Sequence, residues 1–224
     1  GNDLFGDLSA AGNGVADDAG VDIIDGGPGI GQFVWEPGDG SDIISGGDDG
    51  GDVMRFFGSD AAETFNLMPN ALTPTHLNIN LGPATVDTHG VEQIVVTSRL
   101  GDDGFRVFDL TPTEVESVVL DLSAGADGIT VHGRNSNDNI TISRFNITTV
   151  DVLGLGYDVR LMNVATDDNL LVNGNDGDDT IKAVAGVESS VSITLNGGTG
   201  NDFLSADAHK WMLGPMAIGI VYVA

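Results

Sequence analysis

A nine-residue pattern of glycine, aspartate and one large apolar residue recurs along this chain and limits the folds open to it. The copy GGTGNDFLS, residues 197–205, fits Gly-Gly-x-Gly-x-Asp-x-U-x, where U is large and apolar. GNDGDDTIK, residues 174–182, fits with one change, and residues 17–25, 37–45 and 47–55 keep the glycine, the aspartate and the apolar residue. Such a repeat predicts units that stack on their neighbours around a shared core.

Each copy brings hard oxygen ligands to a tight turn. Glycine lets the backbone curl so that carbonyl oxygens converge, and the aspartate adds a carboxylate. Ca²⁺ takes about six to eight oxygen ligands of these kinds. The repeat therefore predicts calcium sites, while Asp-Gly turns of an ordinary β-protein remain an open alternative.

The repeats resemble the calcium-binding repeats of RTX, or haemolysin-type, bacterial secreted proteins over residues 1–55 and about 100–205. The resemblance implies that the six-residue glycine-aspartate half forms a turn, and that the rest forms a short strand. Several Ca²⁺ ions would lie between successive turns. It also implies an extracellular or cell-surface location. The chain shows no signal peptide, so we expect a segment of a longer protein.

The expected calcium ligands are the aspartates of these turns and the carbonyls of their glycines. They are Asp22, Asp42, Asp52, Asp103, Asp127, Asp138, Asp168, Asp179 and Asp202, with Gly20, Gly40, Gly177 and Gly200.

The spacing of the first repeats predicts a coil with two strands. Asp3, Asp22 and Asp42 are separated by about 20 residues, and the intervening turns at Gly31 and Asp52 are also about 20 residues apart. We therefore expect residues 1–56 to form a parallel β-roll, with Asp22 and Asp42 stacked on each other.

Beyond residue 56 the glycines become sparse, but apolar anchors recur about every 11 residues and no helical period is convincing. We expect an all-β chain in which residues 57–205 form a right-handed parallel β-helix solenoid with three strands per coil. Asp103, Asp138, Asp168 and Asp202 would then share one column. The anchors are Ile94, Phe105, Val118, Ile129, Ile140, Val150, Leu161, Leu171, Ile181, Ile193 and Leu204.

The charge of the chain restricts its partners. Lys and Arg total 8 against 34 Asp and Glu, a formal net charge of −26. Such a chain is not expected to bind nucleic acid, which is itself a polyanion. It favours cations, because a bound divalent ion relieves the repulsion between carboxylates. A glycan or cell-surface partner stays open.

The chain has no cysteine, which excludes disulfides and thiolate metal sites. A hydrophobic fraction of 41% argues against simple disorder. The longest apolar run, residues 211–224, is too short to span a bilayer, so membrane insertion is not expected. Open strand edges at the ends of the coil make self-association an expectation.

The end of the chain carries a different signature. Residues 202–224, with His209, Lys210, a Leu-Gly-Pro and a closing Gly-x-x-Tyr-Val, resemble the lysine segment of class V aminotransferases. The resemblance implies that Lys210 matches the lysine that binds pyridoxal phosphate. Nothing upstream resembles the rest of such an enzyme, which needs a large α/β domain. We interpret residues 206–224 as a fused remnant or a capping strand, and Lys210 as non-catalytic.

Two interpretations of function stay open. The first is a calcium-stabilised structural or adhesive segment, in which metal binding is coupled to folding. The alternative is a calcium-dependent hydrolase or lyase acting on phosphoesters or polysaccharide, since a metal with an open position can activate water. It would use paired acids and nearby arginines: Asp102 with Asp103, Asp167 with Asp168, Asp178 with Asp179, and Arg106, Arg134 and Arg144.

Overall fold

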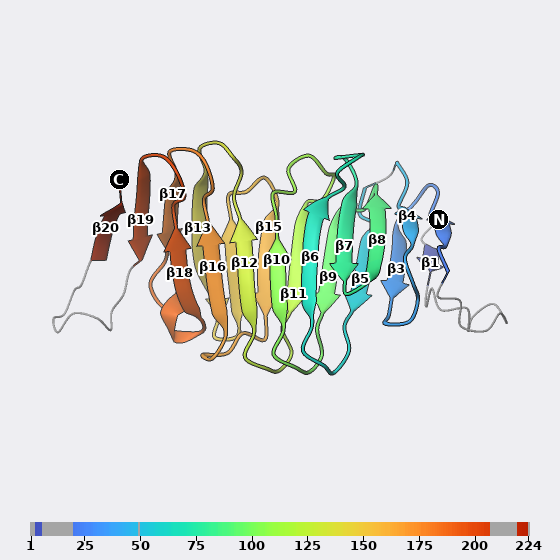
Figure 1. Cartoon of the computed structure of the whole chain (residues 1–224), viewed down its shortest axis with the longest axis horizontal. Coiled ribbons are helices and arrows are strands. Elements are labelled where there is room, and N and C mark those ends of the chain that lie inside the picture. The colour runs from blue at the N-terminus through green and yellow to red at the C-terminus, as the bar shows by residue number, and fades with distance from the viewer. Residues whose placement is uncertain (1–2, 6–19, 49, 207–218, 224) are drawn as a thin grey trace.

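The computed structural model of the chain describes residues 3–5, 20–48, 50–206 and 219–223. It is an all-β protein built from two long sheets that face each other along the length of the molecule (Figure 1). In the described part of the chain, helical structure is limited to the short 3-10 helix η2 (Val187–Ser189).

Sheet A has eleven strands, and sheet B has nine. In spatial order, sheet A contains β1 (Asp3–Phe5), β3 (Gly31–Trp35), β5 (Val53–Phe57), β9 (Gln93–Thr97), β11 (Ser117–Asp121), β15 (Asp158–Met162), β14 (Thr149–Leu153), β13 (Asn139–Asn146), β17 (Thr180–Ala183), β19 (Asp202–Ala206) and β20 (Gly219–Val223). Sheet B contains β18 (Ser192–Asn196), β16 (Asn169–Asn173), β12 (Gly128–His132), β10 (Gly104–Val107), β6 (Thr64–Pro69), β7 (Leu77–Leu81), β8 (Ala84–His89), β4 (Ile43–Ser45) and β2 (Ile23–Asp25).

The chain alternates between the two sheets. From β2 it passes to β3 in sheet A, returns to β4 in sheet B, and continues to β5. Strands of successive circuits pair in parallel, as β9 does with β11 and β10 with β12. Two antiparallel meanders interrupt this pattern, β6–β7–β8 in sheet B and β13–β14–β15 in sheet A.

The core lies between the sheets, because the strands alternate buried and outward side chains. Trp35 stacks on Phe56 at 4.1 Å between ring centroids, and Phe65 stacks on Phe105 at 5.0 Å. Of the predicted anchors, all but two are buried. Ile193 is only partly buried, and Leu171 lies on the outer face of β16 while its neighbour Leu170 is buried.

The expectation of three strands per coil for residues 57–205 is wrong, because the described strands lie in two sheets. Asp103 and Asp168 precede strands of sheet B, whereas Asp138 and Asp202 lie at the start of strands of sheet A. A spacing of three strands is one and a half circuits between two sheets, so Asp103 and Asp138 fall on different sheets, as do Asp168 and Asp202. The sheets are also mixed rather than wholly parallel.

The first repeats follow the predicted two-strand pattern. Strand β2 pairs in parallel with β4, and β3 pairs in parallel with β5. At the other end of the molecule, β20 pairs antiparallel with β19. Lys210 lies outside the described residues, so its predicted role stays untested.

Candidate metal-binding turns

The predicted aspartates occupy one recurrent position, at the start of a strand. Asp127 directly precedes β12, and Asp202 is the first residue of β19. The position is buried because it lies where a turn meets the core. Eight of the nine predicted aspartates are buried at this position, and Asp22 is half-buried: the eight are Asp42, Asp52, Asp103, Asp127, Asp138, Asp168, Asp179 and Asp202.

In sheet B these side chains form a hydrogen-bonded ladder from one circuit to the next. The amide of Glu63 donates to Oδ1 of Asp103 at 2.8 Å, and the amide of Asp103 donates to Oδ1 of Asp127 at 2.8 Å. The amide of Asp127 then donates to Oδ1 of Asp168 at 2.9 Å. Each carboxylate thus extends the backbone hydrogen bonding of the sheet into the turn.

Sheet A carries an equivalent ladder. The amide of Asp138 donates to Oδ1 of Asp179 at 2.8 Å, and the amide of Asp179 donates to Oδ1 of Asp202 at 3.0 Å. Near the beginning of the chain, the amide of Asp22 donates to Oδ1 of Asp42 at 3.0 Å, so the predicted stacking of this pair is confirmed. The amide of Gly31 likewise donates to Oδ1 of Asp52. We call these contacts the aspartate ladders.

The second carboxylate oxygens differ from one turn to another. Oδ2 of Asp168 accepts from the amide of Ala165 at 2.7 Å. By contrast, Oδ2 of Asp42, of Asp103 and of Asp179 is buried and has no hydrogen-bond partner among the described residues. A buried polar atom without a partner is costly, and more so when it carries charge.

Burial also changes the acidity of the ladder carboxylates. It raises the pKa of Asp127 to about 6, and repulsion from Asp168 and Asp103 adds to the effect while the hydrogen bond from the Asp103 amide opposes it. Burial is likewise the main cause of a raised pKa at Asp42, Asp103, Asp168 and Asp179. These groups are stabilised when a proton or a cation joins them.

Backbone carbonyls of the adjacent turn lie close to the carboxylates. A side chain at Gly174 would collide with Oδ2 of Asp179, and its Cβ would lie 2.5 Å from the carbonyl oxygen of Gly197. At Gly133, a Cβ would lie 2.5 Å from Oδ2 of Asp138 and 2.9 Å from the carbonyl oxygen of Gly174. Glycine is needed here because carboxylate and carbonyl oxygens converge on its Cα. This is the donor set that calcium prefers.

The four predicted glycine ligands have different surroundings. Gly177 and Gly200 have φ of 135° and 136°, and their turns stack so closely that a Cβ on Gly200 would overlap the carbonyl of Gly177. The carbonyl of Gly40 accepts a hydrogen bond from Nε1 of Trp35 at 3.1 Å. Gly20 is half-buried at the start of the described residues before β2.

Across residues 20–48 and 50–206, no three His, Asp or Glu side chains group together as ligands for one ion. An ion at these turns would therefore depend on backbone carbonyls for much of its coordination. One turn already contains a cation: Nε of Arg134 lies 2.7 Å from Oδ1 of Asp138, and the Arg134 amide donates to Oδ2 at 2.7 Å. Both carboxylate oxygens of Asp138 therefore have partners, unlike those of Asp179 and Asp103.

The paired acids do not point into one site. In each pair the first aspartate is exposed and the second is buried, as with Asp102 and Asp103 or Asp167 and Asp168. Oδ1 of Asp102 accepts from the amide of Ala126 at 2.9 Å. The three arginines are dispersed: Arg106 is on the outer face of sheet B, Arg134 is paired with Asp138, and Arg144 lies against the turn at Gly186.

Two glutamates belong to the ladders and were missed from the sequence. Oε2 of Glu92 accepts from the amides of Gly51 and Asp52 at 2.7 and 2.9 Å, and Glu63 begins the sheet B ladder. Both directly precede a strand, as the aspartates do. Their position before a strand could have identified them in the sequence. They were missed because neither residue lies in a glycine-aspartate repeat.

No family model, curated protein or solved structure matches this chain. In the part of the chain that the structure describes, no helix is long and apolar enough to cross a membrane.

Proposed function

We propose that this chain is a calcium-binding, calcium-stabilised β-roll solenoid that serves as a structural or adhesive segment of a secreted or cell-surface bacterial protein. The observation that carries the proposal is at Asp179. Its Oδ2 is buried without a hydrogen-bond partner among the described residues, and it converges with the carbonyl oxygen of Gly197 on Gly174. A divalent cation bound by both oxygens would give Oδ2 of Asp179 a partner.

The spacings between ladder partners support a solenoid. Without an intervening meander, ladder partners are 20 to 24 residues apart, as for Asp22 with Asp42 and Asp103 with Asp127. The separation becomes 40 or 41 where a meander lies between, as for Glu63 with Asp103 and Asp127 with Asp168. The meanders are thus insertions into a regular two-strand coil.

Calcium fits these turns better than the other common divalent ions. The available ligands are carboxylate and carbonyl oxygens on stacked turns, and Mg²⁺ demands a tighter octahedral arrangement than backbone carbonyls usually supply. Zinc prefers histidine and cysteine, and cysteine is absent from the chain. With a formal charge of −26, calcium binding also reduces repulsion between the acidic turns.

Calcium would stabilise the fold by binding the native turns, which the unfolded chain lacks. Such coupling suits a protein that works outside the cell, where calcium is plentiful. The resemblance of the repeats to secreted haemolysin-type proteins supports the same location.

The test is a calcium titration of chelator-stripped protein by isothermal calorimetry and thermal unfolding. We expect saturable heat with Ca²⁺ and a Tm that rises with its concentration, while Mg²⁺ gives neither. Asp179→Asn should weaken binding about tenfold or more. Asp167→Asn removes the same charge from an exposed side chain and serves as the matched control. Equal effects of both variants, or no heat with Ca²⁺, would overturn the proposal.

A further inference from the structure

The outer face of sheet B differs from the rest of this acidic molecule. Five of its strands, β6, β10, β12, β16 and β18, lie side by side, and each contributes three outward positions except β10, which contributes two and is followed by Phe108. None of these positions is acidic. They are Thr64, Asn66, Met68, Gly104, Arg106, Phe108, Gly128, Thr130, His132, Asn169, Leu171, Asn173, Ser192, Thr194 and Asn196. We call this surface the neutral strip.

The outer face of sheet A, unlike the neutral strip, carries acidic residues. It carries Asp121 on β11 and Asp158 on β15 among its outward positions. The absence of acid from the neutral strip is therefore not a general property of strands in this chain, whose 34 acids are elsewhere. Hydroxyl and amide side chains predominate instead, and these donate and accept hydrogen bonds without charge.

A groove crosses the neutral strip where two glycines lie next to each other. Gly104 of β10 pairs with Gly128 of β12, with Thr64 and Asn169 on either side in the same row. The hollow has a volume of about 230 Å³, and Arg106, Thr130 and other residues of the strip line it. It runs across the strands, in the direction in which the circuits stack.

The backbone does not require glycine at these two positions. Neither has a positive φ, and a Cβ at Gly128 would approach nothing closer than 4.0 Å, while one at Gly104 would lie 3.4 Å from Oγ1 of Thr64. Glycine weakens a strand, and in a strand it often marks a place where a ligand or another backbone approaches closely. Here its effect is to keep the groove open.

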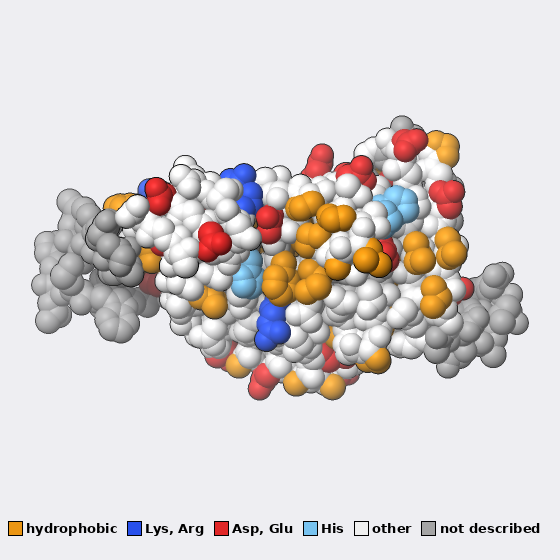
Figure 2. Space-filling view, turned by 45° about the horizontal axis from the view of Figure 1, so that its top comes forward, with side chains coloured by type: hydrophobic (Ala, Val, Ile, Leu, Met, Phe, Trp, Pro, Cys, Tyr) orange, Lys and Arg blue, Asp and Glu red, His pale blue; other side chains and the backbone are white. Residues whose placement is uncertain are grey.

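Polar and aromatic groups surround this groove. Arg106 is exposed, and no acidic side chain among the described residues forms an ion pair with it. The rings of Phe108 and His132 stack at 4.9 Å with planes 1° apart. Figure 2 shows basic, histidine and apolar side chains together over β10 and β12, on a surface that is mostly white around them.

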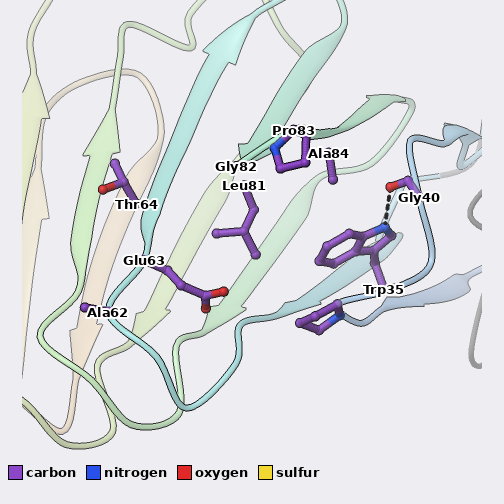
Figure 3. A pocket seen from close by; sticks show the side chains of 11 residues that line it. Trp35, Gly40, Ala62, Glu63, Thr64, Leu81, Gly82, Pro83 and Ala84 are labelled. Atoms are coloured by element: carbon purple, nitrogen blue, oxygen red, sulfur yellow. Dashed lines mark hydrogen bonds between the residues drawn. The ribbon is translucent and has the colours of Figure 1, made fainter.

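A second hollow meets the first at Thr64. Its volume is about 550 Å³, and Trp35, Leu81, Pro83 and the carboxylate-bearing Glu63 line it (Figure 3). Thr64 lines both hollows. The two hollows thus flank Thr64, one with apolar lining at Trp35 and the other on the neutral strip.

We propose that the neutral strip binds an extended, uncharged polysaccharide chain that lies over Gly104 and Gly128. Hydroxyl-rich sugars match its hydroxyls, amides and arginine fork, and their C–H faces match the aromatic pair. An uncharged chain also approaches without repulsion from the net charge of −26, which an anionic polymer would experience. This role goes beyond calcium-dependent stabilisation and does not depend on it.

The experiment is affinity gel electrophoresis of the full chain with calcium present. The gels contain soluble neutral polysaccharides, namely hydroxyethyl cellulose, glycol chitin, laminarin, galactomannan and dextran, with alginate as the anionic comparison. We expect at least one neutral polysaccharide to retard the protein. Gly128→Thr should reduce that affinity tenfold or more by filling the groove, and Arg106→Ala should reduce it by a similar factor.

Gly128→Thr places a good strand former where a Cβ has room, so the fold should persist, and circular dichroism and Tm check that it does. Val95→Thr, on the outer face of sheet A, is the matched control and should bind as the wild type does. The proposal is overturned if no neutral polysaccharide retards the folded protein, if only alginate does, or if Gly128→Thr binds like the control.

Discussion

The backbone amide of Asp103 donates a hydrogen bond of 2.8 Å to Oδ1 of Asp127, 24 residues further along the chain. The side-chain oxygen of Asp127 thus accepts the kind of hydrogen bond that a strand carbonyl accepts within the sheet. The same contact recurs between Asp179 and Asp202 in the other sheet. The aspartates therefore connect successive circuits by hydrogen bonds from one carboxylate oxygen, and a cation would use the second oxygen.

The raised pKa of Asp127 predicts a dependence of stability on pH in calcium-free protein. The folded state holds this proton up to about pH 6, whereas an unfolded aspartate releases it near pH 4. The free energy of unfolding should therefore fall between about pH 4 and 6, by about 3 kcal/mol at most from this group, and level off above. Asp127→Asn should remove most of the pH dependence that this group contributes to the free energy of unfolding. Urea unfolding at several pH values would measure it. Stability that rises over this interval would contradict the assignment.

Glycine should be required at position 174 but not at position 128. Gly174→Ala puts a Cβ against Oδ2 of Asp179 and the carbonyl of Gly197, so we expect a loss of about 2 to 3 kcal/mol in the free energy of unfolding. Gly128→Ala has room for its Cβ and should be neutral or stabilising by up to about 1 kcal/mol. Urea denaturation of both variants checks this, and equal losses would show that the Gly174 turn is not closely packed.

The guanidinium of Arg134 should substitute for a cation at Asp138. Arg134→Gln leaves a buried carboxylate without its positive partner, so we expect a loss of about 1 to 3 kcal/mol in calcium-free buffer. Millimolar Ca²⁺ should recover part of this loss. Arg160→Gln breaks a more exposed pair with Asp151 and should cost less than about 1 kcal/mol at any calcium concentration. Denaturation with and without calcium compares the two, and a loss at Arg134 that calcium leaves unchanged would count against the idea.

The aromatic core should stabilise the protein independently of metal. Phe65 is fully buried and contacts the rings of Phe56 and Phe105, so Phe65→Ala should cost about 3 to 5 kcal/mol with or without calcium. Phe145 is 70% exposed, and Phe145→Ala should cost less than about 1 kcal/mol. Thermal unfolding in both buffers separates this contribution from that of the ladders. A Phe65→Ala loss that disappears with calcium would contradict it.

The sequence pattern predicted the strands and the neighbouring turns, which depend on residues close together in the chain. Alternating apolar residues identified the strands, and the spacing of about 20 residues identified the neighbouring turns of Asp22 and Asp42. Burial of the ladder aspartates other than Asp22 follows from their place at the start of a strand. Leu171 was assigned to the core in place of Leu170, because a shift of one residue exchanges the two faces of a strand.

The arrangement of circuits could not be predicted because strand direction leaves little trace in spacing. The antiparallel strand β14 recurs at nearly the same interval as the parallel ones, so the meander β13–β14–β15 was taken for further parallel strands. The column from Asp103 to Asp138 was false for another reason, because three strands separate these residues and three strands make one and a half circuits between two sheets. Glu63 and Glu92 were missed because their role depends on partners 40 residues away.

The most direct test of the central claim is a crystal structure of the protein grown with millimolar CaCl₂, with anomalous data collected at long wavelength. We predict an anomalous peak about 2.4 Å from Oδ2 of Asp179 and from the carbonyl oxygen of Gly197. Well-ordered turns at Asp103 and Asp179 with only water or no density beside these oxygens would contradict the calcium account. Hydrogen bonds alone, without calcium, would then connect the turns of the ladders.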